Sequence, residues 1–427
     1  MIRIFNYGEV PNAELFIRSQ RIVDVAPAVT EIIRDVEKNG DEALYRLTEK
    51  FDGAKLSRLD VTEAEIDEAM AQVGEDYLAV LRLAAKNIEE YHRHQIRSGF
   101  VMTRENGAVL GQIVTPIDSV GLYVPNGTAA YPSSLLMNCV PAKLAGCRRL
   151  VTVTPPGKDG KVDPAILAAA RIAGVDCIYK VGGAQAVAAL AYGTASIPKV
   201  DKIVGPGNAY VAEAKKQVFG KVAIDTIAGP SEVLIVADDT NDPKVVAADM
   251  LAQAEHDVMA TAVLVTDSKA FAQAVSAELE RQIPLLPRTD IARESIDSNG
   301  KIVIAADLMN AMDCANEIAP EHLEIAVDDP FRYLPFVKNA GSIFLGKHSP
   351  EALGDYLAGP NHTLPTTGTA KFGSPLSVDD FVKKSQYTYY TPQALAEVKD
   401  GLMLFAEKEG LHGHARSVGV RFEEDNS

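Results

Sequence analysis

Cysteines are few in this sequence, and none forms a paired motif. Cys139, Cys147, Cys177 and Cys314 are the four thiols among 427 residues, and no Cys-x-x-Cys occurs. Cys139 and Cys177 have apolar neighbours, so we expect structural thiols rather than nucleophiles. Cys147, which precedes two arginines, is the least implausible nucleophile, although such a thiol is more often inert. Without a disulfide framework the sequence is typical of a reduced compartment, and we expect a cytoplasmic protein.

Long apolar runs and an excess of positive charge are also missing. No apolar stretch approaches the roughly 20 residues of a membrane-spanning helix. The first ten residues, MIRIFNYGEV, lack the basic and apolar segments of a signal peptide. The formal net charge is −16, which disfavours binding to nucleic acid or to an anionic membrane. We expect neither as a partner.

The G-x-G-x-x-G fingerprint of dinucleotide-binding folds is absent as well. Three other glycine-rich turns stand between expected strands and helices: VGLYVPNGTAA, KVGGAQ and VGPGNAY. Such turns bring backbone amides close to a phosphate, but every α/β protein needs turns of this kind. They are compatible with a nucleotide site of a nonstandard form.

What is present indicates a soluble α/β protein. Hydrophobic residues make up 47% and charged residues 23% of the chain, and this length favours two or three domains. Apolar strands alternate with helices after the first quarter of the chain, which predicts parallel sheets covered on both faces. We predict two Rossmann-like parallel-sheet lobes, at 116–236 and 237–375. An N-terminal helical region, 1–115, is expected to pack on the second lobe, and 376–427 to form a C-terminal helical tail.

The stretch LAQAEHD, 251–257, ends a helix that we expect over 243–256. Asp242 and Pro243 give this helix an N-cap and a first-turn proline. Gln253 and His256 are three residues apart, so they share a face, as metal ligands on one helix do. Glutamine is an uncommon zinc ligand, however, and the helix dipole favours histidine at any C-terminus. From this stretch alone a polar helix end is the commoner explanation.

A second candidate is APEHLEI, 319–325, where Glu321 and His322 meet the start of a strand. Histidine titrates near neutral pH and suits general-base catalysis. A carboxylate beside it could orient the ring or activate water. A histidine at a strand entry with an exposed glutamate explains this segment equally well.

Two further segments carry polar residues without a clear structural reason. Residues 353–372 form a long, nearly uncharged loop with Asp355 and His362, and such loops are usually functional or disordered. Asp355 could supply a hard oxygen ligand to zinc. Near the C-terminus, EGLHGHA carries Glu409, His412 and His414. A tail with two histidines is often only solvated, and it matters only if it reaches a site.

Taken together, these segments resemble the histidinol dehydrogenase family over nearly the whole chain. Several long motifs in the same order are far more specific than any one of them. The matching stretches are GLYVPNG, KVGGAQAVAALAYG, VGPGNAYVAEAKKQV, AGPSEVLIVAD, DMLAQAEHD, APEHLEI, AGSIFLG and GPNHTLPTTGTAKF.

The resemblance implies a zinc site and an acid–base pair. In that family the Gln and His of QAEH and the Asp of GDY are zinc ligands, and a tail histidine is the fourth. The spacing from Glu409 favours His414 over His412. Glu321 and His322 would be the catalytic acid–base pair. The zinc ligands here would be Gln253, His256, Asp355 and His414.

The resemblance also implies the remaining contacts. The NAD contacts would be Tyr123, Gln185 and Asn208, and the family itself lacks the usual dinucleotide fingerprint. The substrate contacts would be Ser231, Gln253, His256, His322, Asp355, His362, Glu409 and His414. A homodimer is implied, in which each tail reaches the site of its partner.

The implied reaction is the oxidation of L-histidinol to L-histidine by two NAD, through an aldehyde held in one site, as the last steps of histidine biosynthesis. These residue types suit that chemistry. Hydride loss from an alcohol requires removal of the hydroxyl proton, a role for His322, and the aldehyde needs water, which Glu321 could activate. Zinc would mainly hold the imidazole and amine of the substrate. A related dehydrogenase of another amino alcohol or diol, and a noncatalytic binding protein, are the alternatives.

Overall fold

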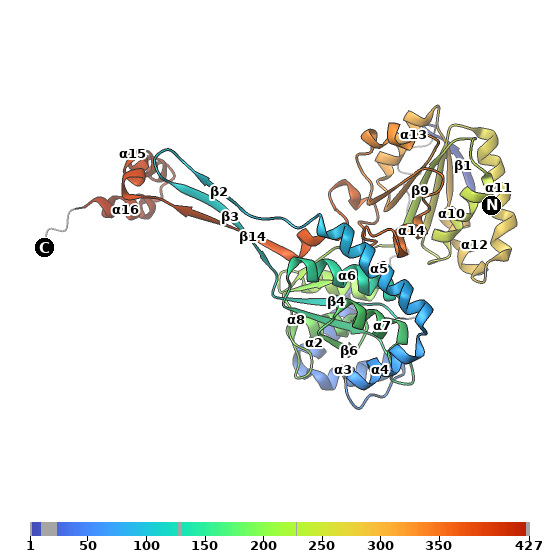
Figure 1. Cartoon of the computed structure of the whole chain (residues 1–427), viewed down its shortest axis with the longest axis horizontal. Coiled ribbons are helices and arrows are strands. Elements are labelled where there is room, and N and C mark those ends of the chain that lie inside the picture. The colour runs from blue at the N-terminus through green and yellow to red at the C-terminus, as the bar shows by residue number, and fades with distance from the viewer. Residues whose placement is uncertain (1, 10–23, 127–129, 228, 424–427) are drawn as a thin grey trace. The chain divides into compact units, whose positions relative to one another are not determined.

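The computed structural model describes residues 2–9, 24–126, 130–227 and 229–423 (Figure 1). They form two compact units. The first unit comprises Met1–Gln95 and Ile117–Phe381, and the second comprises Ile96–Pro116 and Val382–Ser427. Every helix among the described residues is too short or too polar to span a bilayer.

The first unit contains two parallel sheets, as the alternation of strands and helices predicted. The first sheet has five strands in the order β6-β5-β4-β7-β8, so β4, the earliest in the chain, lies in the middle. Its neighbours β5 and β7 pair with it in parallel. The strands are β4 (Ser119–Tyr123), β5 (Arg149–Thr154), β6 (Cys177–Lys180), β7 (Lys202–Val204) and β8 (Ala223–Ile224). The connecting helices are α6 (Pro132–Ala145), α7 (Pro164–Ala173), α8 (Gly183–Tyr192) and α9 (Ala209–Val218).

The second sheet has six parallel strands in the order β1-β11-β10-β9-β12-β13. They are β1 (Arg3–Asn6), β9 (Glu232–Ala237), β10 (Thr261–Thr266), β11 (Lys301–Ile304), β12 (His322–Ala326) and β13 (Ser342–Leu345). Helices α10 (Pro243–Ala254), α11 (Lys269–Gln282) and α12 (Thr289–Ser298) share one hydrophobic core with this sheet. Helix α13 (Leu308–Ile318) contributes to the other. Both faces of the sheet are therefore covered.

Two predicted boundaries are wrong because of this second sheet. The division between residues 236 and 237 would place β9 in the first lobe, yet β9 is an inner strand of the second sheet, between β10 and β12. The amino end was predicted to be helical, yet β1 extends the same sheet by pairing with β11. In both cases the lobe to which the strand belongs depends on the strand with which it pairs. The local sequence pattern does not encode that pairing.

The N-terminal helices pack on the first lobe and not, as expected, on the second. They are α2 (Ala26–Asn39), α3 (Asp41–Asp52), α4 (Glu63–Gln72) and α5 (Glu75–Arg93). The apolar stripe of α2, with Val29 and Val36, shares a core with Val187 of α8 and Val211 of α9. Helices α4 and α5 share a second core with α6 and α7. An amphipathic helix shows which face it buries, but not which surface covers that face.

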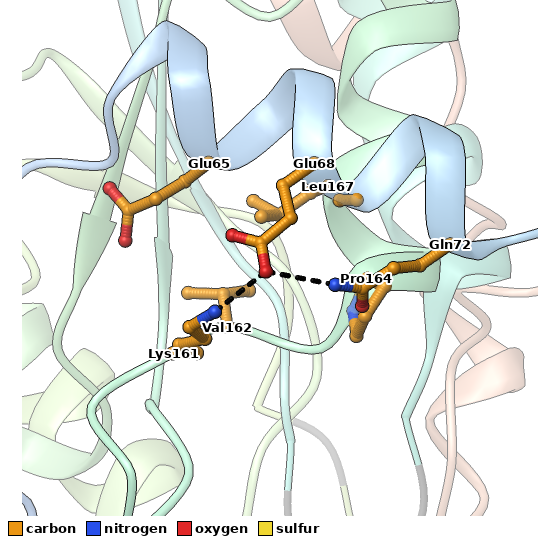
Figure 2. A pocket seen from close by; sticks show the side chains of 8 residues that line it. Glu65, Glu68, Gln72, Lys161, Val162, Pro164 and Leu167 are labelled. Carbon is orange, nitrogen blue, oxygen red and sulfur yellow. Dashed lines mark hydrogen bonds and ion pairs between the residues drawn. The ribbon is translucent and has the colours of Figure 1, made fainter.

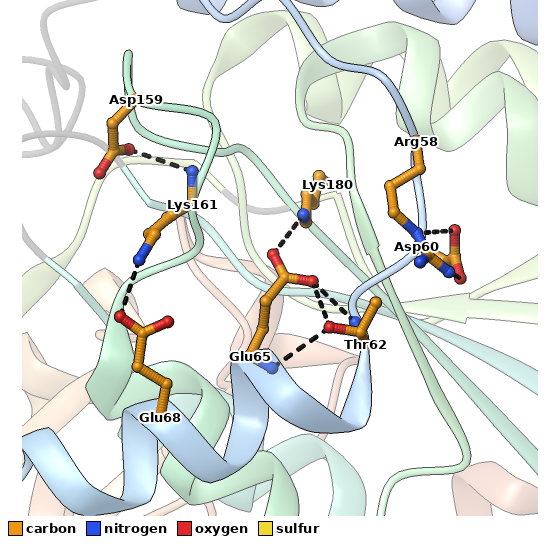
Figure 3. A network of polar contacts seen from close by, with 8 residues as sticks. All are labelled: Arg58, Asp60, Thr62, Glu65, Glu68, Asp159, Lys161 and Lys180. Atoms are coloured by element: carbon orange, nitrogen blue, oxygen red, sulfur yellow. Dashed lines mark hydrogen bonds and ion pairs between the residues drawn. The ribbon is translucent and has the colours of Figure 1, made fainter.

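The start of α4 shows how this docking is fixed (Figure 3). Thr62 and Glu65 form a capping box, in which each side chain bonds the backbone amide of the other. The Glu65 carboxylate also forms an ion pair with Lys180, the last residue of β6. The side chain of Lys180 is only 7% exposed. One glutamate therefore both caps the helix and ties it to the first sheet.

A pocket one turn further along α4 is also lined by polar groups that link this helix to the first lobe (Figure 2). The Glu68 carboxylate accepts hydrogen bonds from Lys161 Nζ, at 2.8 Å, and from Gln72 Nε2, at 3.0 Å. Val162 and Leu167 line the apolar side of the pocket. The charged and amide groups that line the pocket all have partners within the protein, so we assign this pocket to the packing of α4 against the first lobe.

The second unit is built on a three-stranded antiparallel sheet, β14-β3-β2. It contains β2 (Phe100–Thr103), β3 (Val109–Pro116) and β14 (Val382–Tyr389), followed by α15 (Pro392–Lys408) and α16 (His412–Gly419). The tail predicted as helical therefore begins with a strand, because Val382–Tyr389 pairs with β3, far away in the sequence. Leu404 and Phe405 of α15 are 56% and 68% exposed.

Candidate active site

The polar residues of the second lobe gather at the amino edge of its sheet. His322 is the first residue of β12 and pairs in register with Val233 of β9. Gln253 lies in the last turn of α10, and Asp355 lies in α14 (Glu351–Tyr356). Ligand sites of open α/β sheets usually lie at the carboxyl edge. Here the helix C-termini point their carbonyl dipoles at the opposite edge, which favours a positive charge there.

His322 is held as a neutral ring with a defined tautomer. Its Nδ1 lies 3.0 Å from the carbonyl oxygen of Glu232. Because a carbonyl only accepts, Nδ1 must carry the proton, and the lone pair of the neutral ring is on Nε2. Burial lowers the pKa of His322 to about 4, against the opposing effect of the Asp355 carboxylate. The ring is therefore an unprotonated base at neutral pH.

Glu321 lies beside His322 in an equally buried position. Its Oε2 accepts a hydrogen bond from the Glu232 amide at 2.9 Å and is 3.9 Å from His322 Nδ1. Burial raises the pKa of Glu321 well above its usual range, and the Asp355 carboxylate adds to that effect. A carboxyl group shifted in this direction exchanges protons closer to neutral pH than an exposed glutamate does.

Asp355 and His362, which the sequence placed in one loop, lie next to each other. The loop is shorter than predicted, because α14 includes Asp355 and ends at Tyr356. His362 Nδ1 is 3.5 Å from Asp355 Oδ1, and its Nε2 is 3.2 Å from Ser134 Oγ. Burial raises the pKa of Asp355, but the hydrogen bond to His362 and the charges of His362, His322 and His256 outweigh it, so the pKa is lowered overall.

Glu351 is a member of this cluster that sequence reasoning missed. His322, Glu351 and Asp355 offer ligand atoms that all lie within 4.8 Å of one another. With its amide nitrogen toward Glu351, Gln253 donates to the two carboxylate oxygens at 2.7 and 2.9 Å. The only sequence signal was the i, i+4 spacing between Glu351 and Asp355, which places two acids on one helix face.

The acids of this cluster suit a cation. Among the described residues, Glu321, Glu351 and Asp355 have histidines and no lysine or arginine as ion-pair partners. Burial raises the pKa of Glu351 well above its usual range, and the carboxylates of Asp355, Glu321 and Glu324 reinforce this. Burial likewise raises the pKa of Glu324, to about 8. Oxygen and nitrogen donors around uncompensated acids fit a divalent metal.

The other predicted residues of this lobe lie near the same edge. His256 is exposed and follows the end of α10 at Ala254, so the helix is two residues shorter than predicted. Its amide donates to the Gln253 carbonyl at 3.2 Å, which keeps the two residues in one turn. Ser231 is half-buried and directly precedes β9.

The three residues predicted to contact NAD belong to the carboxyl edge of the first sheet. Tyr123 ends β4, Gln185 lies in the first turn of α8, and Asn208 caps α9. The Tyr123 hydroxyl accepts from the Gly183 amide at 3.0 Å, and burial raises the pKa of Tyr123 to about 12. Asn208 is exposed. Residues 127–129 of the first glycine-rich turn lie outside the described residues.

The tail candidates belong to the second unit. Glu409 follows α15, and His412 and His414 lie in α16, all three exposed within that unit. The cysteines are consistent with structural roles: burial raises the pKa of Cys139 to about 12 and that of Cys147 to about 11. Such thiols are not ionised at neutral pH.

Known proteins match both the sequence and the fold. A family model described as histidinol dehydrogenase matches residues 17–422. Histidinol dehydrogenase of Clostridium acetobutylicum is 52% identical over 427 residues, 99% of each chain. That of Bacillus cereus is 56% identical over 397 residues, 93% of this chain and 92% of its own. The crystal structure of histidinol dehydrogenase from Elizabethkingia anophelis matches with a TM-score of 0.94 at 36% identity, covering 100% of this chain and 99% of its own. The chain belongs to the histidinol dehydrogenase family.

Proposed function

We propose that this protein oxidises L-histidinol to L-histidine in two successive NAD-dependent steps, with the intermediate aldehyde held at the amino edge of the second sheet. The family membership supports the reaction. The observation that carries the assignment of residues is the hydrogen bond from His322 Nδ1 to the Glu232 carbonyl. It leaves His322 Nε2 as a buried, unprotonated base beside a buried carboxyl group.

In the first step, His322 accepts the hydroxyl proton of the alcohol while the carbon loses hydride to NAD. Removing that proton is the part of the step for which a general base is needed, and positioned bases of this kind contribute about 10²–10⁴-fold in rate. The low pKa of His322 keeps Nε2 available to accept a proton throughout the neutral range.

In the second step, Glu321 takes a proton from water, which adds to the aldehyde carbon. The adduct then transfers the hydrogen that remains on this carbon, as hydride, to a second NAD, and the carboxylic acid results. The raised pKa of Glu321 makes this carboxylate a stronger base than an exposed one. Its hydrogen bond from the Glu232 amide fixes one oxygen and leaves the other for the reaction.

Zinc fits the donor set at this edge. Gln253, His256, Asp355 and the tail residue His414 would hold it, and the bound ion would fix the imidazole and amine of the substrate and stabilise negative charge. Glu351 would orient a ligand rather than bind zinc itself. Its carboxylate accepts from the Gln253 amide nitrogen, which leaves the Gln253 amide oxygen for the metal. Ser231 and His362 would contact the substrate directly.

We also infer that the tail acts in a homodimer, with Glu409 and His414 entering the site of the partner subunit. The second unit is compact by itself, and its α15 exposes Leu404 and Phe405. Exposed apolar side chains on a short helical segment favour burial against another chain. In the first lobe, Tyr123, Gln185 and Asn208 would contact NAD at the carboxyl edge of the sheet.

The experiment that tests the proposal is spectrophotometric NADH formation with L-histidinol, before and after chelation of divalent metals. We expect two NADH per histidine formed, loss of activity on chelation, and recovery with zinc. An amino alcohol without an imidazole is the control substrate. Turnover of that control as fast as L-histidinol would favour the alternative dehydrogenase, and no NADH with either substrate would reject the enzyme assignment.

A further inference from the structure

A buried ion pair closes the turn that follows β7. Lys215 of α9 and Asp225, directly after β8, form it, and their side chains are 2% and 3% exposed. Both also bond one residue of the turn, Gly205. Lys215 Nζ donates to the Gly205 carbonyl at 2.9 Å, and the Gly205 amide donates to Asp225 Oδ2 at 2.7 Å.

Stability gives little reason for such a pair. Removing two charges from water is costly, and replacing a buried pair by apolar side chains of similar volume is often neutral or stabilising. What Lys215 and Asp225 do together is more specific, because one bonds the carbonyl and the other the amide of Gly205. The pair therefore fixes a peptide segment rather than only filling space.

Gly205 has no side chain of its own to hold it in place. Its φ is +122°, and a Cβ atom would lie 2.1 Å from the carbonyl oxygen of Tyr123, so only glycine fits. Tyr123 ends β4, the neighbour of β7 in the sheet. The chain continues from β4 to β5 on one side of the sheet and from β7 to β8 on the other, so the strand order reverses between β4 and β7. Open α/β sheets bind ligands at such a topological switch point.

The turn carries a residue for which the proposed function predicts a cofactor contact. Asn208 follows Gly205 by three residues, and its Oδ1 accepts from the amides of Tyr210 and Val211, at 3.0 and 3.2 Å. This cap uses the side-chain oxygen of an exposed residue, so the amide nitrogen is the group left for a cofactor. The position of the Asn208 amide nitrogen depends on the backbone conformation of residues 205–208.

We propose that Lys215 and Asp225 are positioning residues for NAD. Their ion pair holds both peptide groups of Gly205, and thereby sets the turn 205–208 and the Asn208 side chain at the β4–β7 switch point. The inference rests on the proposed function, because it requires the cofactor at this edge. The printed bonds of the pair among the described residues are to each other and to Gly205, so we expect its effect to reach the cofactor rather than the acid–base residues or the candidate metal ligands.

The test is a double variant, Lys215→Met with Asp225→Leu, which removes both charges together. We expect the Kd for NADH, measured by its fluorescence, and the KM for NAD to rise about tenfold. The KM for L-histidinol and the zinc content should stay within about twofold of wild type. Asp225→Asn keeps an oxygen for the Gly205 amide and should raise the Kd about threefold.

A matched control is Lys202→Met. Lys202 is also a buried lysine of the first lobe, but it is the first residue of β7 and makes no bond to the turn at Gly205 among those described. Its Nζ donates to the Asp380 carbonyl at 2.7 Å. Its loss should leave the Kd for NADH unchanged. An unchanged Kd in a folded double variant overturns the inference. If the double variant does not fold, an unchanged Kd in Asp225→Asn overturns it instead. Absence of NADH binding in the wild-type enzyme rejects the proposed function itself.

Discussion

The side-chain amide of Gln253 faces the carboxylate of Glu351, and in the orientation that gives the amide a hydrogen-bond partner its nitrogen lies 2.7 Å from Oε1 and 2.9 Å from Oε2. An amide nitrogen only donates and an amide oxygen only accepts, so this contact determines which end of Gln253 is left for another partner. Losing a group that orients a metal ligand in this way typically lowers metal affinity by about 10–100-fold. Glu351 should therefore matter for zinc without being one of its four ligands.

We predict that Glu351→Ala lowers zinc affinity by about 10–100-fold, the usual range for such orienting partners. The physical reason is that Gln253 can then turn its nitrogen toward the metal. Glu351→Gln still offers one acceptor oxygen and should lose less. Zinc per chain after dialysis against a weak chelator is the measurement, with Glu42→Ala, an exposed acid of α3, as the control. Wild-type zinc content in Glu351→Ala would contradict this role.

The acid–base pair predicts different losses in the two half-reactions. Asn in place of His322 can still donate toward the Glu232 carbonyl but has no basic nitrogen, so His322→Asn should slow histidinol oxidation about 10²–10⁴-fold. Glu321→Gln should slow histidinal oxidation more than histidinol oxidation, because only the aldehyde step needs activated water. Each substrate is supplied separately and NADH is followed. Equal losses in both half-reactions for both variants would contradict the division of roles.

The burial of Asp52 predicts a pH dependence of stability. Its Oδ2 is buried without a hydrogen-bond partner among the described residues, and burial raises the pKa of Asp52 to about 6. The folded protein therefore holds this proton more tightly than the unfolded chain between about pH 4 and pH 6. Stability falls as pH rises through that window and stays lower above it.

Asp52→Asn should remove this loss. The variant should match wild type near pH 3.5 and exceed it above pH 7, by on the order of 1 kcal/mol after allowance for the partial exposure of the group. Urea unfolding at both pH values measures the difference. Asp35→Asn is the opposite control, because hydrogen bonds from Arg46 and Asn39 lower the pKa of Asp35. A variant no more stable than wild type above pH 7 would rule out the effect of Asp52.

The alternation of apolar strands and helices predicted most strands of the two parallel sheets, because residues buried on both faces leave a continuous apolar run. It could not predict where α2–α5 pack, since the stripe with Val29 and Val36 fits any apolar surface of the right shape. The pairing of β14 with β3 joins segments more than 250 residues apart, and no local pattern records such a register.

The site was predictable to a different degree. The i, i+3 spacing predicted Gln253 and His256 on one helix face, but α10 ends at Ala254 and His256 lies in the turn that follows. Their predicted role as zinc ligands came from the resemblance and not from the spacing. The tautomer of His322 depends on the Glu232 carbonyl, a backbone atom of another strand, and therefore has no sequence signal. Glu351 was missed because an acid at the start of a short helix is ordinarily solvent-exposed, whereas this one is 3% exposed.

The crossing tail makes the sharpest prediction, because it assigns residues of one site to two chains. If His414 serves the partner subunit, His414→Ala spoils the site of the partner, whereas His322→Asn spoils the site of its own chain. Each homodimer is then inactive. In a mixed dimer, one site collects both lesions and the other is intact.

Mixing the two inactive variants should therefore restore up to about half the activity of a wild-type dimer in each mixed dimer, by counting sites in a closed two-fold assembly. Zinc should also be retained at the intact site, because under this proposal its fourth ligand would arrive with the second chain. NADH formation and zinc per dimer are measured after subunit exchange, which native mass spectrometry verifies. His412→Ala is the control, since the spacing from Glu409 favours His414 as the ligand, and it should remain active alone. If each tail stays with its own chain, every site in the mixture keeps one lesion. No recovered activity after verified exchange would then reject the crossing tail.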